Sequence, residues 1–225
     1  PYNAIDLIFK ELPENKITII GNGISVVGAF QKALIKKDDI IFQNVGCASM
    51  GYDIPATVGA CFSQDKKKPK KIFCLTGDGS FQFNFQELQT INKFKFNVTI
   101  FVINNGGYSS MKQSQNKFTN SIGMHGVDEK TGVSFPNLKK ISKVYEFNYF
   151  RTSNFNNLRN TIRKLNYKKR NLIEIFVDKK QNFEPKVSSK VNEFGGFEVD
   201  DLYDMSPKIP KDELIKIMEL NKEIT

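Results

Sequence analysis

Two short turns in this sequence carry the residue types that bind a divalent cation and a phosphate. GDGS, 77–80, ends one apolar run, and NNGGY, 104–108, ends the next. Asp78 offers a carboxylate, Asn105 offers an amide oxygen, and the glycine pair leaves a main-chain carbonyl free. Hard oxygen ligands of this kind suit Mg²⁺, which keeps open positions for phosphate oxygens when the protein supplies few ligands.

The glycines and the serine of the first turn fit the same chemistry. Gly77 and Gly79 allow a sharp bend and a close approach of the backbone to a ligand, and Ser80 adds a hydroxyl and an N–H at the start of a helix. Taken singly, each turn could equally be a helix cap or a left-handed turn. Together, each at a strand end, they predict a magnesium-diphosphate clamp.

The elements that position these turns alternate along the chain. Short, continuously apolar runs indicate strands covered on both faces, and the stretches between them carry apolar residues at helical spacing. This order predicts an α/β fold, a three-layer Rossmann-like sandwich with a mostly parallel sheet. The expected strands are 17–21, 39–44, 71–77, 98–104 and 171–178, and the expected helices are 25–36, 50–64, 84–94, 137–147 and 154–165.

The spacing between Asp78 and Asn105 fits a turn, a crossover helix and a second parallel strand. Such strands can be neighbours, and ligands of open α/β sheets lie outside the carboxyl ends of the strands. We therefore expect both side chains at one edge of the sheet.

One large domain accounts for most of the chain. Residues 1–178 show the alternating pattern, whereas 179–225 are polar and broken by prolines until a short helix near 212–221. We expect the first range to be the cofactor domain and the second to be a tail.

Composition narrows the class of protein further. The 225 residues are 40% hydrophobic, enough for a packed core, and neither a membrane-length apolar run nor a signal-peptide pattern is visible. A soluble, cytoplasmic protein is the expectation. Cys47, Cys61 and Cys74 lack CxxC spacing and are expected to be core thiols.

The net charge of +9 is partly concentrated in the runs KKDD, KKKPKK and NYKKRN. Basic runs can bind nucleic acid or a membrane surface. No RNA-binding, zinc-finger or basic-zipper pattern accompanies them, and KKKPKK suits a solvated loop. We therefore expect no nucleic-acid partner and no membrane partner.

The paired turns give the chain a family resemblance. GDGS followed by NNGGY resembles the signature of enzymes that use thiamine diphosphate, and NVGCASMGYDIPATVGA, 44–60, is similar to the equivalent stretch of acetolactate synthases. The resemblance covers about residues 15–178 and extends less firmly to TGVSFPNL and FEPKVSSK, which are similar to acetolactate-synthase-like proteins often associated with surface polysaccharides.

The resemblance assigns roles to individual residues. It implies that Asp78, the Asn105 side chain and the Gly107 carbonyl hold Mg²⁺. Gly77, Gly79 and Ser80 would lie at the diphosphate, the backbone around Ala48 and Met50 would meet the aminopyrimidine, and the Met50 side chain would wedge between the two rings of the cofactor.

Two further positions are less specific. Asn22, in the GNG turn after the first strand, could line the diphosphate side of the cofactor or belong to a helix-capping turn. His125, the one histidine, lies in a glycine-containing loop where these enzymes often place substrate-facing residues, and its role stays open.

The implied reaction is decarboxylation of pyruvate or another 2-oxo acid, with transfer of the acyl unit to a carbonyl acceptor. A second pyruvate, another 2-oxo acid and a keto-sugar are the candidate acceptors. A 2-oxo-acid decarboxylase, an oxidoreductase subunit and a non-catalytic cofactor-binding or assembly subunit are the alternatives.

The sequence departs from the resemblance in what it omits. Enzymes of this type have a pyrimidine-binding domain with an activating glutamate, and acetolactate synthases add a middle domain that can carry FAD. Neither is recognisable in this sequence. We expect the pyrimidine-binding domain in the same longer chain or in a partner subunit, and we expect a homo-oligomer.

Overall fold

The structure, a computed structural model, describes residues 1–65, 67–118 and 123–222. Lys66, one member of the KKKPKK run, lies outside the described residues. The chain divides into two compact units, Pro1–Gln181 and Asn182–Thr225.

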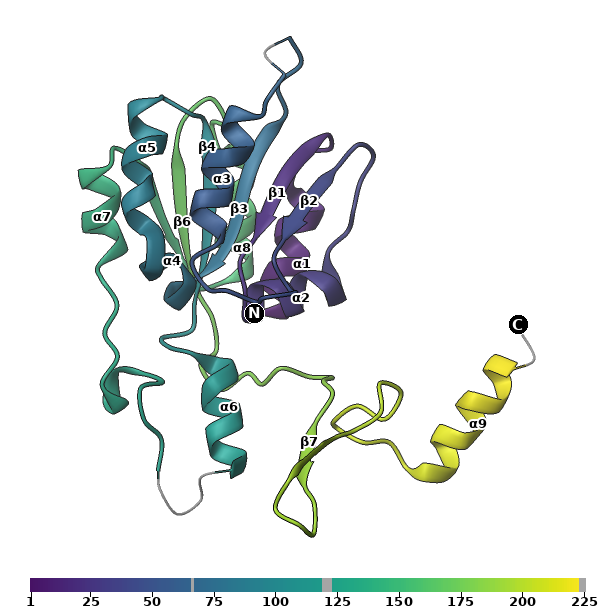
Figure 1. The fold of residues 1–225 in the computed structure, drawn as a ribbon. Helices are drawn as coiled ribbons and strands as arrows, with labels where there is room; N and C mark the ends of the chain where they lie inside the picture. Colours follow the sequence, from purple (N-terminus) through teal and green to yellow (C-terminus); the bar gives the residue numbers. More distant parts are fainter. Residues whose placement is uncertain (66, 119–122, 223–225) are drawn as a thin grey trace. The chain divides into compact units, whose positions relative to one another are not determined.

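A parallel sheet organises the first unit (Figure 1). Its strand order is β2-β1-β3-β4-β6-β5, and every neighbouring pair is parallel. This confirms the expected α/β fold with its parallel sheet. The strands are β1 Lys16–Ile20, β2 Ile40–Gln43, β3 Lys71–Gly77, β4 Val98–Asn104, β5 Asn148–Thr152 and β6 Asn171–Phe176.

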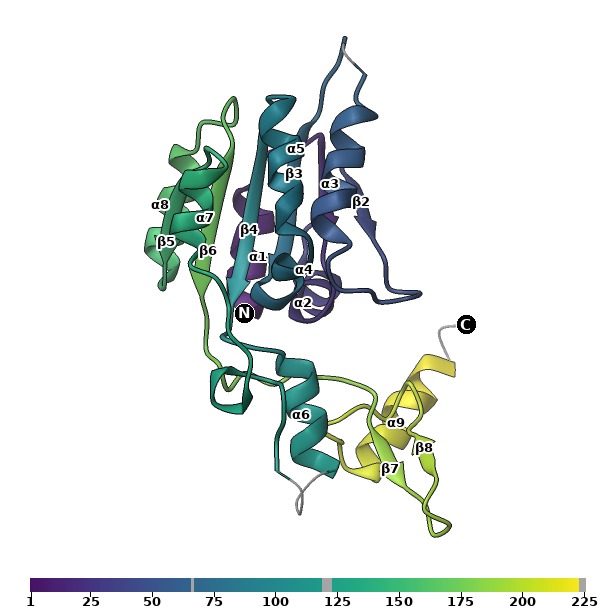
Figure 2. The same ribbon diagram turned by 60° about the vertical axis from the view of Figure 1, so that its left-hand side comes forward.

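Helices cover both faces of this sheet, which makes the three layers (Figures 1 and 2). One face carries α1 Tyr2–Glu11, α2 Ile24–Lys32 and α8 Phe155–Lys164. The other carries α3 Asp53–Phe62, α4 Asp78–Asn84, the 3₁₀ turn η1 Phe85–Glu87, α5 Leu88–Lys93 and α7 Leu138–Val144. Helix α6, Ser109–Phe118, and the 3₁₀ turn η2, Glu129–Thr131, follow the end of β4.

Burial explains why the central strands are apolar throughout. β4 is buried over Val98–Ile103, and β3 over Ile72–Thr76, because helices cover both sides of each. Alternate residues of these strands face opposite layers, so Cys74 and Ile100 join the core beneath α3 and α5. The buried strands β1, β3 and β4 therefore hold the GNG, GDGS and NNGGY turns at fixed positions.

The structure differs from the sequence expectations at several elements. The helix expected over 84–94 begins at Asp78 and is interrupted by η1. β5 and α6 were not expected, because their sequences, NYFRT and SSMKQSQNKF, are too polar to show a buried face. Cys47 is exposed, so the expectation of a core thiol was wrong there, because the small residues around it run over the surface.

The second unit holds a small hairpin and a helix. β7, Ser189–Val191, pairs antiparallel with β8, Phe197–Val199, and α9 spans Lys211–Lys222. The sequence had predicted the helix but not the hairpin. None of the described helices is both long enough and apolar enough to span a bilayer.

Candidate cofactor site

The strand order brings three turns together. β3 lies between β1 and β4, and the register pairs Ile20 with Leu75 and Gly77 with Ile103, so the three strands end close to one another. After β1 the chain moves to β2 on one side, then returns to β3 on the other. Ligands of open α/β sheets bind at such a switch point, at the carboxyl ends of the strands.

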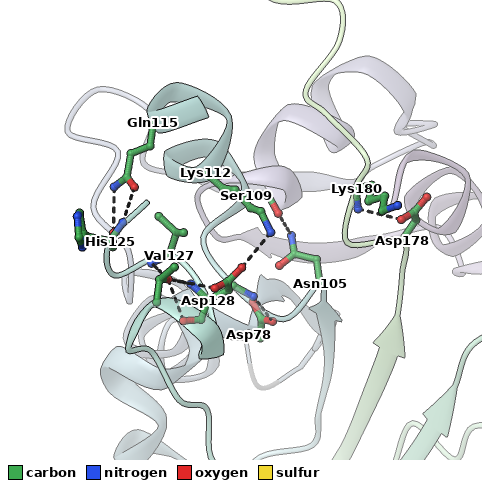
Figure 3. A network of polar contacts seen from close by, with 12 residues as sticks. Asp78, Asn105, Ser109, Lys112, Gln115, His125, Val127, Asp128, Asp178 and Lys180 are labelled. Carbon is green, nitrogen blue, oxygen red and sulfur yellow. Dashed lines mark hydrogen bonds and ion pairs between the residues drawn. The ribbon is translucent and has the colours of Figure 1, made fainter. Parts of the chain in front are cut away.

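Asp78 reaches from the end of β3 into the turn that follows β4 (Figure 3). Its Oδ2 accepts hydrogen bonds from the backbone N–H groups of Gly106, at 2.7 Å, and Gly107, at 3.3 Å. Its Oδ1 accepts one from Gly79 at 2.8 Å. The structure thus brings together the two turns that the sequence predicted to be neighbours.

Asn105 presents an oxygen that the fold does not use. Its side-chain N–H donates to Ser109 Oγ at 2.6 Å, but its buried Oδ1 has no hydrogen-bond partner among the described residues. Buried acceptors without partners are uncommon and call for an explanation. A cation beside Asp78 would provide the partner, so the residues fit a bound Mg²⁺.

The donor set is consistent with a hard cation that uses few carboxylates. Within the described residues, no group of three or more His, Cys, Asp or Glu side chains could hold a metal ion. Asp78, the Asn105 amide and a main-chain carbonyl are what this turn can offer. Such a set suits Mg²⁺ completed by phosphate oxygens better than Zn²⁺, which prefers nitrogen and sulfur.

Two glycines are required by close contacts at the site. A Cβ on Gly79 would lie 2.3 Å from the ring of Tyr108, and a Cβ on Gly107 would lie 2.2 Å from the carbonyl oxygen of Val127. Both positions admit only glycine without rearrangement. Gly77, in contrast, meets nothing closer than Ile103 O at 4.0 Å.

Burial alters the acidity of Asp78. The side chain is 5% exposed, and loss of solvent raises its pKa from 3.8 to about 6, although the backbone hydrogen bonds from Gly79, Gly106 and Gly107 oppose the rise. A neighbouring cation would favour the ionised form.

The loop before α3 lies against the same turns. Asn22 Nδ2 donates to the carbonyl of Ser49 at 2.7 Å, and Asn84 Nδ2 donates to the carbonyl of Gly51 at 2.8 Å. The half-buried Met50 lies between Ser49 and Gly51, whose carbonyl groups accept these hydrogen bonds. The structure therefore places Asn22 beside the loop between β2 and α3, residues 44–52, which we call the Met50 loop, and the amide nitrogen of Asn22 holds that loop.

Ala48 and His125 lie in less buried surroundings. Ala48 is exposed, with a φ of 50°, and its N–H donates to Asn44 O at 2.9 Å. His125 is exposed, and its backbone exchanges hydrogen bonds with the side chain of Gln115 (Figure 3). These contacts assign no chemistry to the imidazole.

Ser80 makes hydrogen bonds that the sequence did not indicate. Its Oγ accepts from the N–H of Gly51 at 2.8 Å and donates to Asp53 Oδ2 at 2.8 Å. The hydroxyl proton of Ser80 is therefore used in a hydrogen bond within the protein. The backbone N–H is the group that Ser80 can donate to a phosphate. The sequence patterns did not single out Asp53 as a site residue, although an acidic residue at the start of the apolar segment DIPATVGA was a signal that could have done so.

A second buried carboxylate supports the turn after β4. Glu174 of β6 accepts from Asn104 Nδ2 at 2.6 Å and from the hydroxyl of Tyr149. Asn104 Oδ1 in turn accepts from the Gly106 N–H at 3.1 Å. The turn that holds Asn105 is thus fixed from β6 as well as from β3.

A cavity of about 470 Å³ opens beside the turn after β4. Lys112 and Asp128, which form an ion pair at 2.9 Å, are part of its lining (Figure 3). Lys179 and Lys180 also line it, and Lys179 packs against Gly106. The cavity leaves space for a ligand beside this turn, and lysine side chains form part of its lining.

Comparison with known proteins identifies relatives of this chain. Residues 22–175 match the family described as thiamine pyrophosphate enzyme, C-terminal TPP binding domain. The acetolactate synthase large subunit of Porphyra purpurea is 29% identical over 147 residues, which cover 65% of this chain and 24% of that protein. Pyruvate decarboxylase isozyme 3 of Saccharomyces cerevisiae is 34% identical over 104 residues, covering 46% of this chain and 18% of that protein.

Solved structures show the same fold. Benzoylformate decarboxylase from Polynucleobacter necessarius superposes with a TM-score of 0.68 at 21% sequence identity, over 80% of this chain and 33% of that one. The chain spans about a quarter of the length of the first acetolactate synthase it matches.

Proposed function

Because this chain belongs to the thiamine pyrophosphate enzymes, as an acetolactate synthase-like C-terminal TPP-binding domain, we propose that it is the diphosphate-binding domain of a carboligase. The enzyme would decarboxylate pyruvate or another 2-oxo acid and transfer the acyl unit to a carbonyl acceptor. A keto-sugar is one candidate acceptor. Thiamine pyrophosphate, also called thiamine diphosphate, supplies when bound the electron sink that decarboxylation of a 2-oxo acid requires.

The residues of the clamp take the following proposed roles. Asp78, Asn105 Oδ1 and the Gly107 carbonyl hold Mg²⁺, and the unpartnered Asn105 Oδ1 is the observation that carries this assignment. The backbone of Gly79 and Ser80, at the bend that Gly77 begins, approaches the diphosphate.

The loop before α3 takes the other end of the cofactor. Ala48 and Met50 meet the aminopyrimidine, and the Met50 side chain keeps the two rings bent toward each other. Asn22 holds the carbonyl of Ser49 through its amide nitrogen. These residues orient the cofactor and exclude water, and the proton transfers belong to a glutamate that we place outside this chain.

The remaining parts of the protein are also proposals. Residues 1–178 form the cofactor domain and 179–225 a C-terminal tail. A pyrimidine-binding domain, in the same longer chain or a partner subunit, completes the site in a homo-oligomer. FAD, if the protein uses it, belongs to a middle domain beyond this chain.

A simple 2-oxo-acid decarboxylase is the second candidate function. The similarity to pyruvate decarboxylases of Saccharomyces cerevisiae and Candida albicans favours it. Product analysis with pyruvate separates the two, because a carboligase yields a ligated hydroxy-ketone product and a decarboxylase yields free aldehyde.

A thermal-shift titration tests the clamp itself. Thiamine diphosphate at about a hundredfold excess over its Kd should stabilise the protein by about 2.7 kcal/mol, raising Tm by roughly 5 to 10 °C. We expect this shift to require Mg²⁺ and to vanish in Asp78→Ala. Asp65→Ala should keep the full shift. It removes an exposed carboxylate from the loop before β3, at the amino end of that strand and away from the clamp. An undiminished shift in Asp78→Ala would refute the assignment of the metal site.

A further inference from the structure

Asp53 is a fully buried carboxyl group without a cationic partner among the described residues. It is 0% exposed, and it opens α3 immediately after the Met50 loop. Burial raises its pKa, against the effect of the hydrogen bonds it accepts. A buried carboxyl group is costly to the fold unless its oxygens are hydrogen-bonded.

Both oxygens of Asp53 are hydrogen-bonded. Oδ1 accepts from the N–H of Ile54 at 2.9 Å, and Oδ2 accepts from the hydroxyls of Ser80, at 2.8 Å, and of Thr76. Thr76 belongs to β3 and Ser80 to the first turn of α4. Asp53 thus joins the start of α3 to the segment that contains Asp78.

The orientation of the Ser80 hydroxyl depends on this contact. A serine hydroxyl has one proton to donate, and here it points to Asp53 Oδ2. A lone pair of the same oxygen therefore faces the N–H of Gly51, 2.8 Å away. The result is a relay from Gly51 through Ser80 to Asp53 that ties the Met50 loop to the GDGS turn.

Asp53 also occupies the space at the end of β1. A Cβ on Gly21 would lie 2.0 Å from Asp53 Oδ2, so the backbone at Gly21 and the carboxyl group are in direct contact. Gly21 precedes Asn22, which holds the other part of the Met50 loop through Ser49. The carboxyl group of Asp53 therefore contacts the GNG turn and the GDGS turn directly, and it reaches the Met50 loop through the hydroxyl of Ser80.

We propose that Asp53 is a positioning residue, which holds the Met50 loop and the GDGS turn in a fixed relation so that one cofactor molecule meets both. Asp53 touches neither the cofactor nor the substrate in this role and acts through Ser80 and Gly51. The inference rests on the proposed function, because it assigns the diphosphate to the GDGS turn and the aminopyrimidine to the Met50 loop.

The test compares Asp53→Ala with Asp53→Asn and Thr57→Val in the assembled protein. Asparagine keeps an oxygen that can accept from Ser80, so it should partly rescue the alanine variant. Thr57 is the matched control, because it is equally buried and donates to the backbone carbonyl of Asp53 rather than to the carboxyl group that forms the relay. Two quantities are measured: hydrogen exchange of the segment containing Gly51 in the cofactor-free protein, and the Kd of thiamine diphosphate at saturating Mg²⁺.

We expect Asp53→Ala to speed exchange at Gly51 and to raise the Kd, each by tenfold or more, with Asp53→Asn in between. Thr57→Val should lower Tm but change both quantities less than twofold. Ser80→Ala should raise the Kd as well, and its effect should not add to that of Asp53→Ala, because both variants break one relay.

The outcomes separate the inference from the proposed function. If the unaltered protein fails to bind thiamine diphosphate, the proposed function is wrong and the role of Asp53 toward the cofactor falls with it. If that protein binds and the Asp53 variants match Thr57→Val in Kd and exchange, only the positioning role is overturned. Should Asp53→Ala not fold, Asp53→Asn and Ser80→Ala decide by the same two measurements.

Discussion

At the scale of single residues, burial makes the negative charge of Asp78 costly to the fold. Its carboxylate is buried and surrounded by backbone N–H groups rather than by lysine or arginine side chains. These hydrogen bonds offset only part of the lost solvation, which is why the pKa of Asp78 rises to about 6.

This shift predicts the pH dependence of the metal-free protein. The folded protein holds the proton of Asp78 to a higher pH than the unfolded chain does, so the associated stabilisation is complete below about pH 4 and is lost as pH rises through 6. The difference corresponds to about 3 kcal/mol. Asp78→Asn cannot titrate, and its unfolding free energy should fall less over this range.

Urea unfolding at several pH values, with a chelator present, measures both proteins. The difference between them isolates Asp78 from other titrating groups. Equal slopes for the two proteins between pH 4 and 6 would contradict the shift. Added Mg²⁺ should reduce the loss in the unaltered protein, because it favours the carboxylate.

The proximity of the GDGS and NNGGY turns could be predicted, because their residue types and their order along the chain are specific. Asp78 and Asn105 follow strands, and neighbouring parallel strands end together. Asp53 could not be found in the same way, since its role depends on hydroxyls of Thr76 and Ser80 that reach it only through folding. The hydrogen bond from the Asn22 amide nitrogen to Ser49 could not be predicted for the same reason.

At the scale of elements, the first turn of α4 must lie against the aromatic ring of Tyr108. Gly79→Ala should push the two apart, lower the stability by about 1 to 3 kcal/mol and weaken binding of thiamine diphosphate with Mg²⁺ at least tenfold. Gly59→Ala is the matched substitution, because Gly59 lies in α3 with open space around its Cβ position. It should stabilise the protein by about 0.5 to 1 kcal/mol.

Thermal unfolding and a binding titration on both variants check this. If Gly79→Ala were as well tolerated as Gly59→Ala, the result would contradict the claim that the contact between α4 and Tyr108 requires glycine at position 79.

Most of the sheet was predictable, because central parallel strands are apolar on both faces. β5 is an edge strand, and its half-exposed residues, NYFRT, lack that signal. The sequence of α6, SSMKQSQNKF, has too few apolar residues for its helix to be found from hydrophobic spacing. The break at η1 depends on how the chain packs after Asn84 rather than on any helix-breaking residue.

At the scale of the whole molecule, we propose that the chain provides one side of a cofactor site. It spans about a quarter of an acetolactate synthase large subunit. We therefore expect no pyruvate consumption by this chain alone, even with thiamine diphosphate and Mg²⁺ at saturation. Activity should appear when the pyrimidine-binding part is supplied.

Coupled detection of pyruvate loss, with and without that part, measures this. Sustained turnover by the chain alone would contradict the proposed division of the site. Asp78→Ala serves as the control in both conditions, since it should remove any activity that depends on the clamp.

The place of β6 in the sheet has a consequence for biosynthesis. β6 is the last strand of this sheet along the chain, yet it lies between β4 and β5, and its Glu174 holds Asn104 in the turn after β4. While the ribosome is still translating the segment before β6, β4 has no neighbour on that side and Asn104 has no carboxylate to bond. The turn that we propose binds the metal is therefore completed late in synthesis, after most of the domain has left the ribosome.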